Sequence, residues 1–264
     1  MKFLLLFLLL PLTAKAYTLN NSIGARFDNE NVNVRVGLNP TPCAFVDLDE
    51  VASLLNEAMD GFWNKVSTSR LQLKTSGSEN TGDDNYLTGE LCLIGGSCGG
   101  TPVPATSDII VTCNNNITNF PGGSSLLALT LPNVISGKDI KGAVVLLNDR
   151  NGSFDNLTRD QKIAVIAHEV GHAIGLGHSK ESSALMFYKI VPTRNSLARD
   201  DRLGVTYLYP VQLDLFGAGC FLGTINTLGD GGGTNSFWPT ALVGLLLTLL
   251  LKRPKKENAA SSPA

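Results

Sequence analysis

The three histidines of this 264-residue chain all lie in one stretch of eleven residues, from His168 to His178. Histidines with unrelated structural roles would be spread along the sequence. Residues four apart lie on one face of an α-helix, so His168 and His172 can direct their ring nitrogens at one metal ion. Glu169 is the next residue around that helix and can reach a water molecule at the metal without being a ligand. The stretch therefore predicts a helix that carries a metal site.

The residues after this helix supply a third ligand. Gly175 allows a sharp chain reversal that a residue with a Cβ atom would resist, and His178 then returns toward the metal. Three imidazoles with one open position are typical of a catalytic zinc site, whereas structural sites use four protein ligands. The alternative is a helix that carries two histidines for structural reasons. The extended motif argues against it, because a glycine and a third histidine make the His-Glu-x-x-His pattern much more specific.

The sequence around and beyond the third histidine resembles a known family. Residues 183–188 (Ser-Ala-Leu-Met-Phe-Tyr) resemble the Met-turn of the metzincin proteases, in which Met186 lies beneath the zinc ligands. The alternative for Met186 is simple core filling. Residues 157–179, with Ser179 directly after the third histidine, resemble the active-site helix of the matrixins, the matrix metalloproteinase-like family.

The resemblance to matrixins extends over residues 32–209 and is sharp from residue 157 onward. Residues 197–204 are similar to the opening of their final helix. In that family the paired aspartates, here Asp200 and Asp201, brace this helix against the Met-turn and the mature N-terminus. Glu169 would be the general base of the family's zinc-dependent peptide hydrolysis.

The family's fold is α+β, of the α/β/α-like metzincin type. It implies a twisted five-stranded mixed sheet, a long first helix, an active-site helix, and a small C-terminal subdomain that holds the Met-turn and the final helix. The apolar patterns place strands at residues 31–38, 70–75, 108–113, 126–131 and 142–148, the first helix at 47–66, and the start of the active-site helix near Thr158.

The resemblance makes residues 126–131 the exposed antiparallel edge strand. An edge strand has unpaired backbone groups, so a peptide substrate can add itself there as another strand. A merely structural edge strand is the alternative.

The chain departs from the matrixin pattern in three places. Tyr188 stands where matrixins usually have a proline. A tyrosine there resembles the astacins and serralysins, whose tyrosine can touch the zinc or the transition state, although Tyr188 as a pocket wall is an equal alternative. No histidines remain for the matrixins' structural zinc, and the Pro-Arg-Cys-Gly propeptide motif is missing.

The implied activity is that of a zinc metalloendopeptidase acting on extracellular proteins, with one catalytic Zn²⁺. The ion lowers the pKa of water to ~7, and Glu169 takes the proton and delivers it to the leaving amine. A different class is a catalytically inactive metzincin-fold module for binding or adhesion, and the intact Glu169 and histidines argue against it. Calcium stays open as a second ion, because Asp149 and Asp155 offer oxygen ligands.

Both ends of the chain resemble targeting segments. Residues 1–16 read as a signal peptide, with an apolar run too short to span a bilayer and a small-x-small site before Tyr17. The catalytic domain is expected at 17–212, followed by a linker with Cys220 at 213–236, a transmembrane helix at 237–251 and a basic cytoplasmic tail at 252–264.

The C-terminal tail resembles the sorting tails of bacterial surface proteins, and a plain membrane anchor is the alternative. Its fifteen apolar residues rise about 22 Å as a helix, short of the ~30 Å hydrocarbon core, so flanking residues would have to close the gap. The chain is therefore expected to be exported to the cell surface, the periplasm or the extracellular space. A formal net charge of −2 offers no broad basic surface for nucleic acid.

Four cysteines lie inside the expected catalytic domain and allow three pairings. In the metzincin sheet, strands 31–38 and 108–113 would be parallel neighbours, which brings Cys43 and Cys113 to the same edge. This implies the pair Cys43–Cys113 and leaves Cys92–Cys98 to close a glycine-rich loop. Four free thiols are the alternative.

Overall fold

The computed structural model describes residues 17–92, 98–189 and 194–211. The chain divides into two compact units, Met1–Leu213 and Asp214–Ala264, and everything described lies in the first. The predictions for the signal peptide, for the apolar segment 237–251, for the basic tail and for Cys220 therefore lie outside the described residues. Within the described residues, no helix has the length and the apolar character needed to cross a membrane.

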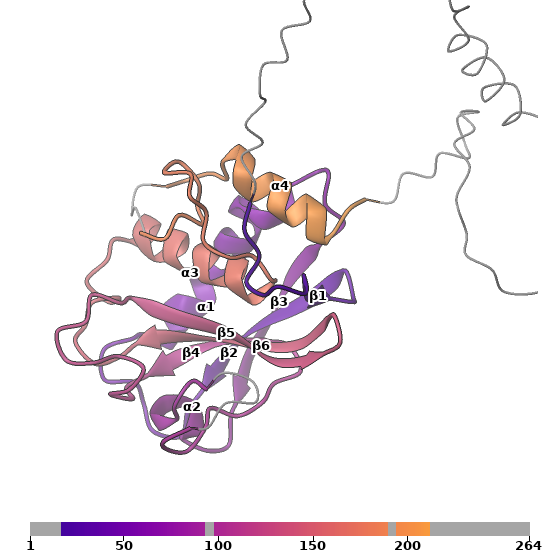
Figure 1. The fold of residues 1–264 in the computed structure, drawn as a ribbon. Coiled ribbons are helices and arrows are strands. Elements are labelled where there is room, and N and C mark those ends of the chain that lie inside the picture. Colours follow the sequence, from indigo (N-terminus) through magenta and orange to yellow (C-terminus); the bar gives the residue numbers. More distant parts are fainter. Residues whose placement is uncertain (1–16, 93–97, 190–193, 212–264) are drawn as a thin grey trace, which may run out of the picture. The chain divides into compact units, whose positions relative to one another are not determined.

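A mixed sheet of six strands forms the centre of the domain (Figure 1). The strands are β1 (Arg26–Phe27), β2 (Asn31–Leu38), β3 (Gln72–Asn80), β4 (Ile109–Asn114), β5 (Ala128–Ser136) and β6 (Asp139–Asn148). Parallel pairings give the order β1-β6-β4-β2-β3, and β5 runs antiparallel to β6. The mixed sheet and the antiparallel edge strand agree with the prediction. The sixth strand, β1, was not predicted, since two residues are too few to show an alternating pattern.

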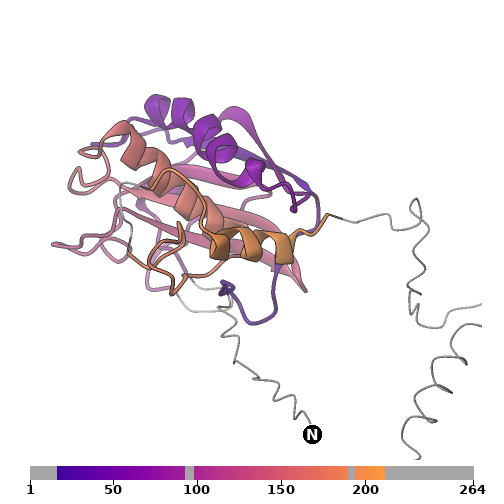
Figure 2. The ribbon, with the colours of Figure 1, turned by 90° about the horizontal axis from the view of Figure 1, so that it is seen from above.

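Helices cover both faces of this sheet. The helices of the described residues are α1 (Leu48–Gly61), the short 3₁₀ helix η1 (Trp63–Lys65), α2 (Asn85–Thr88), α3 (Arg159–Ala173) and α4 (Arg199–Leu208). Figures 1 and 2 show α1 and α3 side by side over one face, and Figure 1 shows α2 on the opposite face. The first helix ends at Gly61, earlier than predicted, and the chain continues as η1.

The central strands are apolar on both sides because both faces are covered. Alternate residues of β4 and β6 therefore enter two separate cores. Val111, Val145 and Leu147 belong to the core that includes α1 and α3, while Ile110, Val144 and Leu146 pack with Tyr86 of α2 and with Phe120.

The start of α3 is fixed by a capping box, as the hydroxyl of Thr158 suggested. The Thr158 Oγ1 accepts the Gln161 amide at 3.4 Å, and the Gln161 side chain accepts the Thr158 amide at 2.9 Å. One turn on, the buried Lys162 Nζ lies 2.6 Å from Glu50 Oε2 near the start of α1. The Lys162–Glu50 ion pair thus links the start of α3 to α1.

The structure contains both predicted disulfides. Cys43–Cys113 has a Cα–Cα distance of 6.2 Å, and Cys92–Cys98 one of 5.7 Å. As predicted, β2 and β4 are parallel neighbours, so the residues that follow β2 reach the C-terminal part of β4.

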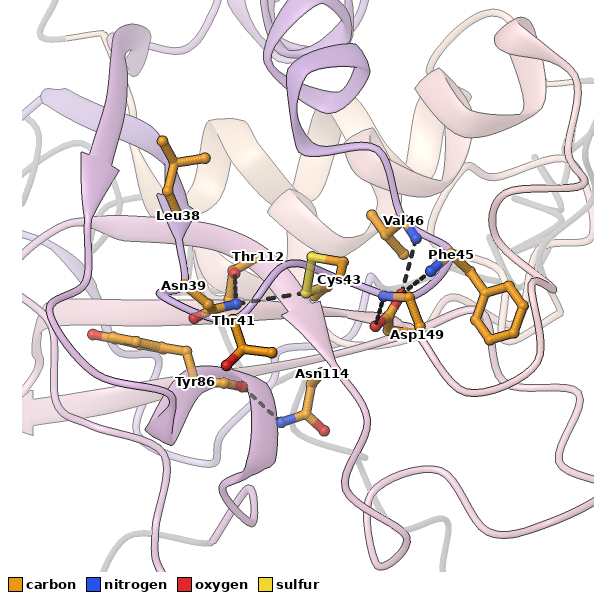
Figure 3. The surroundings of a disulfide bond; sticks show 12 residues. Leu38, Asn39, Thr41, Cys43, Phe45, Val46, Tyr86, Thr112, Asn114 and Asp149 are labelled. Atoms are coloured by element: carbon orange, nitrogen blue, oxygen red, sulfur yellow. Dashed lines mark hydrogen bonds between the residues drawn. A yellow bond between two sulfur atoms is a disulfide. The ribbon is translucent and has the colours of Figure 1, made fainter.

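The loop before α1 is also held by Asp149, which directly follows β6 (Figure 3). Its two carboxylate oxygens accept the amides of Ala44, Phe45 and Val46 at 2.6, 2.7 and 2.9 Å. Asp149 is almost completely buried, and both of its carboxylate oxygens accept hydrogen bonds from the loop. The structure thus gives this candidate calcium ligand a structural role.

Candidate active site

The active-site helix α3 places three predicted residues together. His168 and Glu169 are buried, with 2% and 4% of their surface exposed, and His172 lies one turn further along. His178 comes from the segment beyond the helix, and ring nitrogens of the three histidines all lie within 4.8 Å of one another. The structure therefore brings the predicted ligand set to one point.

The hydrogen bonds of the rings show which nitrogen faces that point. His168 Nδ1 lies 2.7 Å from the Leu185 carbonyl and His172 Nδ1 lies 2.8 Å from the Leu176 carbonyl. A carbonyl oxygen only accepts, so each Nδ1 donates and each Nε2 carries a lone pair. Outward carbonyl partners of this kind orient metal-binding histidines in proteins.

The electrostatics of the rings also suit a metal ion. Burial lowers the pKa of both His168 and His172 to about 4, so the rings are neutral near pH 7 and can act as ligands. The Nε2 atoms of His172 and His178 are 3.1 Å apart, so one cation could contact both. The donor set of three imidazoles, two of them neutral with a defined lone pair, fits a zinc ion.

Gly175 makes the turn that returns His178 to the helix. Its φ is +107°, and an added Cβ would collide with the backbone oxygen of Ala25 and lie 3.2 Å from Leu208. Both the left-handed conformation and the close approach require glycine, as the sequence predicted.

We expect Gly175→Ala to destabilise the protein by more than about 1 kcal/mol, because the native backbone conformation is incompatible with a side chain. Chemical denaturation of the purified protein measures this change. Gly61→Ala is the matched control, since Gly61 has no positive φ and an added Cβ would meet nothing within 4 Å. Equal stability of Gly175→Ala and wild type would contradict the role assigned to Gly175.

Met186 lies against the active-site helix at Gly171. A Cβ added at Gly171 would overlap the Met186 sulfur and lie 2.7 Å from the Trp63 ring, so this contact needs the absence of a side chain. Trp63 also donates from Nε1 to the Ala167 carbonyl at 2.9 Å. The roles of Gly171 and Trp63 were not among the predicted features. Only the glycine inside the His-Glu-x-x-His motif could have drawn attention to the close packing.

Asp201, at the start of α4, connects the Met-turn to the first histidine. Its carboxylate accepts the amides of Leu185, Met186 and Ala198 at 2.7, 3.0 and 2.8 Å. The Leu185 carbonyl is in turn the partner of His168 Nδ1. Asp201 thus fixes the peptide that orients a candidate metal ligand.

Asp200 binds the residue next to the third histidine. Its Oδ2 accepts the Ser179 hydroxyl at 2.5 Å, and the Ser179 amide donates to the Met186 carbonyl at 2.6 Å. Asp200 therefore contacts the chain before the Met-turn, and Asp201 contacts the turn itself. These contacts agree with the implied bracing against the Met-turn, and the implied contact with the mature N-terminus stays a prediction.

A cleft of about 730 Å³ opens beside the histidines. It is lined by residues 125–130, which enter β5, by residues 18–20, by Gly177, by His168, Glu169, His172 and His178, and by Tyr188 and Lys189. Tyr188 is 57% exposed, and its ring centre lies 4.4 Å from that of Phe187. The structure thus places Tyr188 in the wall of the cleft, and its contact with the zinc or the transition state stays a prediction.

The segment Thr18–Asn20 lies along the exit from the active-site helix. Thr18 Oγ1 donates to the His178 carbonyl, and the Gly177 amide donates to the Thr18 carbonyl at 2.9 Å. Asn20 Nδ2 donates to the His172 carbonyl at 3.2 Å. This arrangement is not predictable from the sequence, because a segment of three residues has no periodic pattern.

Glu169 reaches across to the edge strand. Its Oε2 accepts a hydrogen bond from the Thr130 hydroxyl at 2.6 Å. Burial raises the pKa of the Glu169 carboxyl, while the neighbouring His172 and the Thr130 hydrogen bond act in the opposite direction. The sequence does not predict this contact between Thr130 and Glu169.

Comparison with known proteins agrees with this geometry. Residues 111–210 match the family model described as Matrixin. Karilysin from Tannerella forsythia is 34% identical over 98 residues, which cover 37% of this chain and 21% of the relative. Metalloendoproteinase 2-MMP from Arabidopsis thaliana is 31% identical over 93 residues, which cover 32% of this chain and 25% of the relative.

A third relative covers a shorter stretch. Matrix metalloproteinase-B from Caenorhabditis elegans is 50% identical over 48 residues, covering 17% of this chain and 9% of the relative. The chain spans no more than a quarter of the length of these curated relatives. The matched region is thus similar in sequence to the matrixins, and the mixed sheet and the histidine group of the described residues agree with a metzincin-like fold.

Proposed function

We propose that this protein is an exported zinc-dependent endopeptidase that hydrolyses peptide bonds of extracellular proteins. The observation that carries the proposal is the convergence of three imidazoles and a buried carboxylate in one cleft. The relatives named as metalloproteinases and metalloendoproteinases support the same reaction class.

The residues of the site divide into metal-holding and proton-transferring groups. His168, His172 and His178 would hold the zinc ion, which supplies Lewis acidity toward water and toward the scissile carbonyl. Glu169 accepts a proton from the attacking water and delivers it to the leaving amine. Its burial next to the histidines keeps the carboxylate close to the reacting atoms.

The substrate would bind along the edge strand. β5 pairs with β6 on one side, and no other strand of the described residues pairs with it. Residues 125–130 line the cleft, so an extended peptide can add to β5 and pass the histidines. We therefore propose that the protein substrate binds along residues 126–131.

Export is supported by residues 1–16 and by the disulfides. A secretion signal would deliver the chain to an oxidising compartment, where disulfides form and persist. Cys43–Cys113 joins two parts of the catalytic domain 70 residues apart in the sequence, which suits such a compartment.

Removal of zinc tests the proposed function. We expect a chelator to abolish cleavage of casein or gelatin, and stoichiometric zinc to restore it, because the histidines without a cation cannot polarise the carbonyl. Product formation on a gel and the zinc content of the protein are measured together. Full cleavage by protein shown to be free of metal would contradict the proposal. Peptide binding without cleavage by the zinc-loaded protein would instead indicate a binding or adhesion module.

A further inference from the structure

We propose that Thr130 is a positioning residue that holds the Glu169 carboxylate in its working orientation; this inference rests on the proposed function. The two residues are 39 positions apart and come from different elements, β5 and α3. Their hydrogen bond, 2.6 Å long, connects the strand expected to receive substrate with the expected general base.

The geometry assigns different roles to the two carboxylate oxygens. Oε2 accepts the Thr130 hydroxyl, and among the described residues no side chain donates to Oε1. One oxygen is therefore held by β5 and the other stays available to a water molecule in the cleft. A carboxylate with no such partner could rotate about its last torsion, which has a broad energy profile.

The position of Thr130 on the sheet explains why its hydroxyl can reach the Glu169 carboxylate. Ala128 and Thr130 lie on the same side of β5, since side chains alternate along a strand. Leu129, on the other side, packs with the second core around Phe120. Thr130 thus offers its hydroxyl on the side of the strand that faces α3.

A purely structural role would predict a different result from substitution. As a half-buried residue on an edge strand, Thr130 could satisfy its hydroxyl with water and would not need Glu169. A positioning residue should instead change the chemical step and leave substrate binding unchanged.

The test compares Thr130→Val and Thr130→Ser in the zinc-loaded protein. Valine keeps the branched shape and strand preference but lacks the hydroxyl, so we expect kcat to fall roughly 10- to 100-fold, as for loss of a hydrogen bond to a charged group. KM should change less than about twofold, since uniform substrate binding is retained. Thr130→Ser restores the donor and should recover most of kcat.

Thr75→Val is the matched control. Thr75 is a half-buried threonine on β3, at the opposite edge of the sheet, and its Oγ1 donates to Asn56 Oδ1 on α1. This variant should keep the kcat of wild type. A kcat of Thr130→Val equal to wild type, or no recovery with serine, would overturn the proposal.

Crystal structures of the zinc-loaded wild type and Thr130→Val separate this proposal from the proposed function. We expect the hydrogen bond in the wild type and a rotated or disordered Glu169 carboxylate in the variant. An unchanged carboxylate in Thr130→Val would overturn the positioning role whatever the activity. A rotated carboxylate in a protein that cleaves no peptide would keep the positioning role and reject the peptidase.

Discussion

Glu169→Gln is expected to lower kcat for peptide hydrolysis by about 10²- to 10⁴-fold, the usual contribution of a positioned general base. Glutamine has nearly the same shape but cannot accept a proton from water at neutral pH. Its side-chain oxygen can still accept the Thr130 hydroxyl that now binds Oε2. The change therefore removes the proton transfer with little change in packing.

The zinc content separates this role from that of a ligand. The metal should remain bound in Glu169→Gln at the wild-type stoichiometry, because the three histidines are untouched. Glu57→Gln is the control, since Glu57 is half exposed on α1 and pairs with Arg159 on the surface. We expect it to cleave like the wild type. Peptide cleavage by Glu169→Gln at the wild-type rate would remove Glu169 from the mechanism.

The parts of the site that the sequence predicted are local in the chain. The spacing of His168 and His172 determines that they share a helix face, and the φ of Gly175 agrees with the predicted reversal. The predicted hydroxyl cap at Thr158 is likewise local, because it binds an amide three residues further along the chain. Such features depend on backbone geometry over one or two turns, which the sequence encodes directly.

The parts that the sequence did not predict depend on how distant segments meet. Thr130 reaches Glu169 only because β5 adds to β6 in a particular register beside α3. Thr18 and His178 meet across 160 positions of sequence. A single sequence can predict that a segment forms a strand or a turn. It does not predict which distant segment will pack beside that strand or turn.

The exact ends of the strands also depend on pairing between segments and not on the local sequence alone. The strand expected at 126–131 begins at Ala128 and continues to Ser136, because the hairpin with β6 pairs residues beyond Pro132. The pairing register shifts between Leu131 and Ile135, so that Pro132 and the residue after it are accommodated as an irregularity in the strand. The alternating pattern alone predicts that the strand ends before the proline, because proline has no N–H to donate to the hydrogen bonds between strands.

His172→Ala is expected to remove the metal as well as the activity. Two imidazoles would remain of the three, and a site with two protein ligands does not reach the three that catalytic zinc sites use. We expect zinc stoichiometry to fall from about one to near zero after dialysis against micromolar zinc. Cleavage of casein should fall below detection in the same samples.

Thermal unfolding gives a readout that does not depend on activity. A ligand that binds only the folded state stabilises it, by about 4 kcal/mol when its free concentration is 1,000 times Kd. Zinc should therefore raise the Tm of the wild type and of Glu169→Gln and leave that of His172→Ala unchanged. The metal-free proteins serve as the reference, because a lower Tm of metal-free His172→Ala alone would report lost packing. An equal zinc-induced rise in Tm for wild type and His172→Ala would show that the ion binds elsewhere, and the assignment of all three histidines as its ligands would then be wrong.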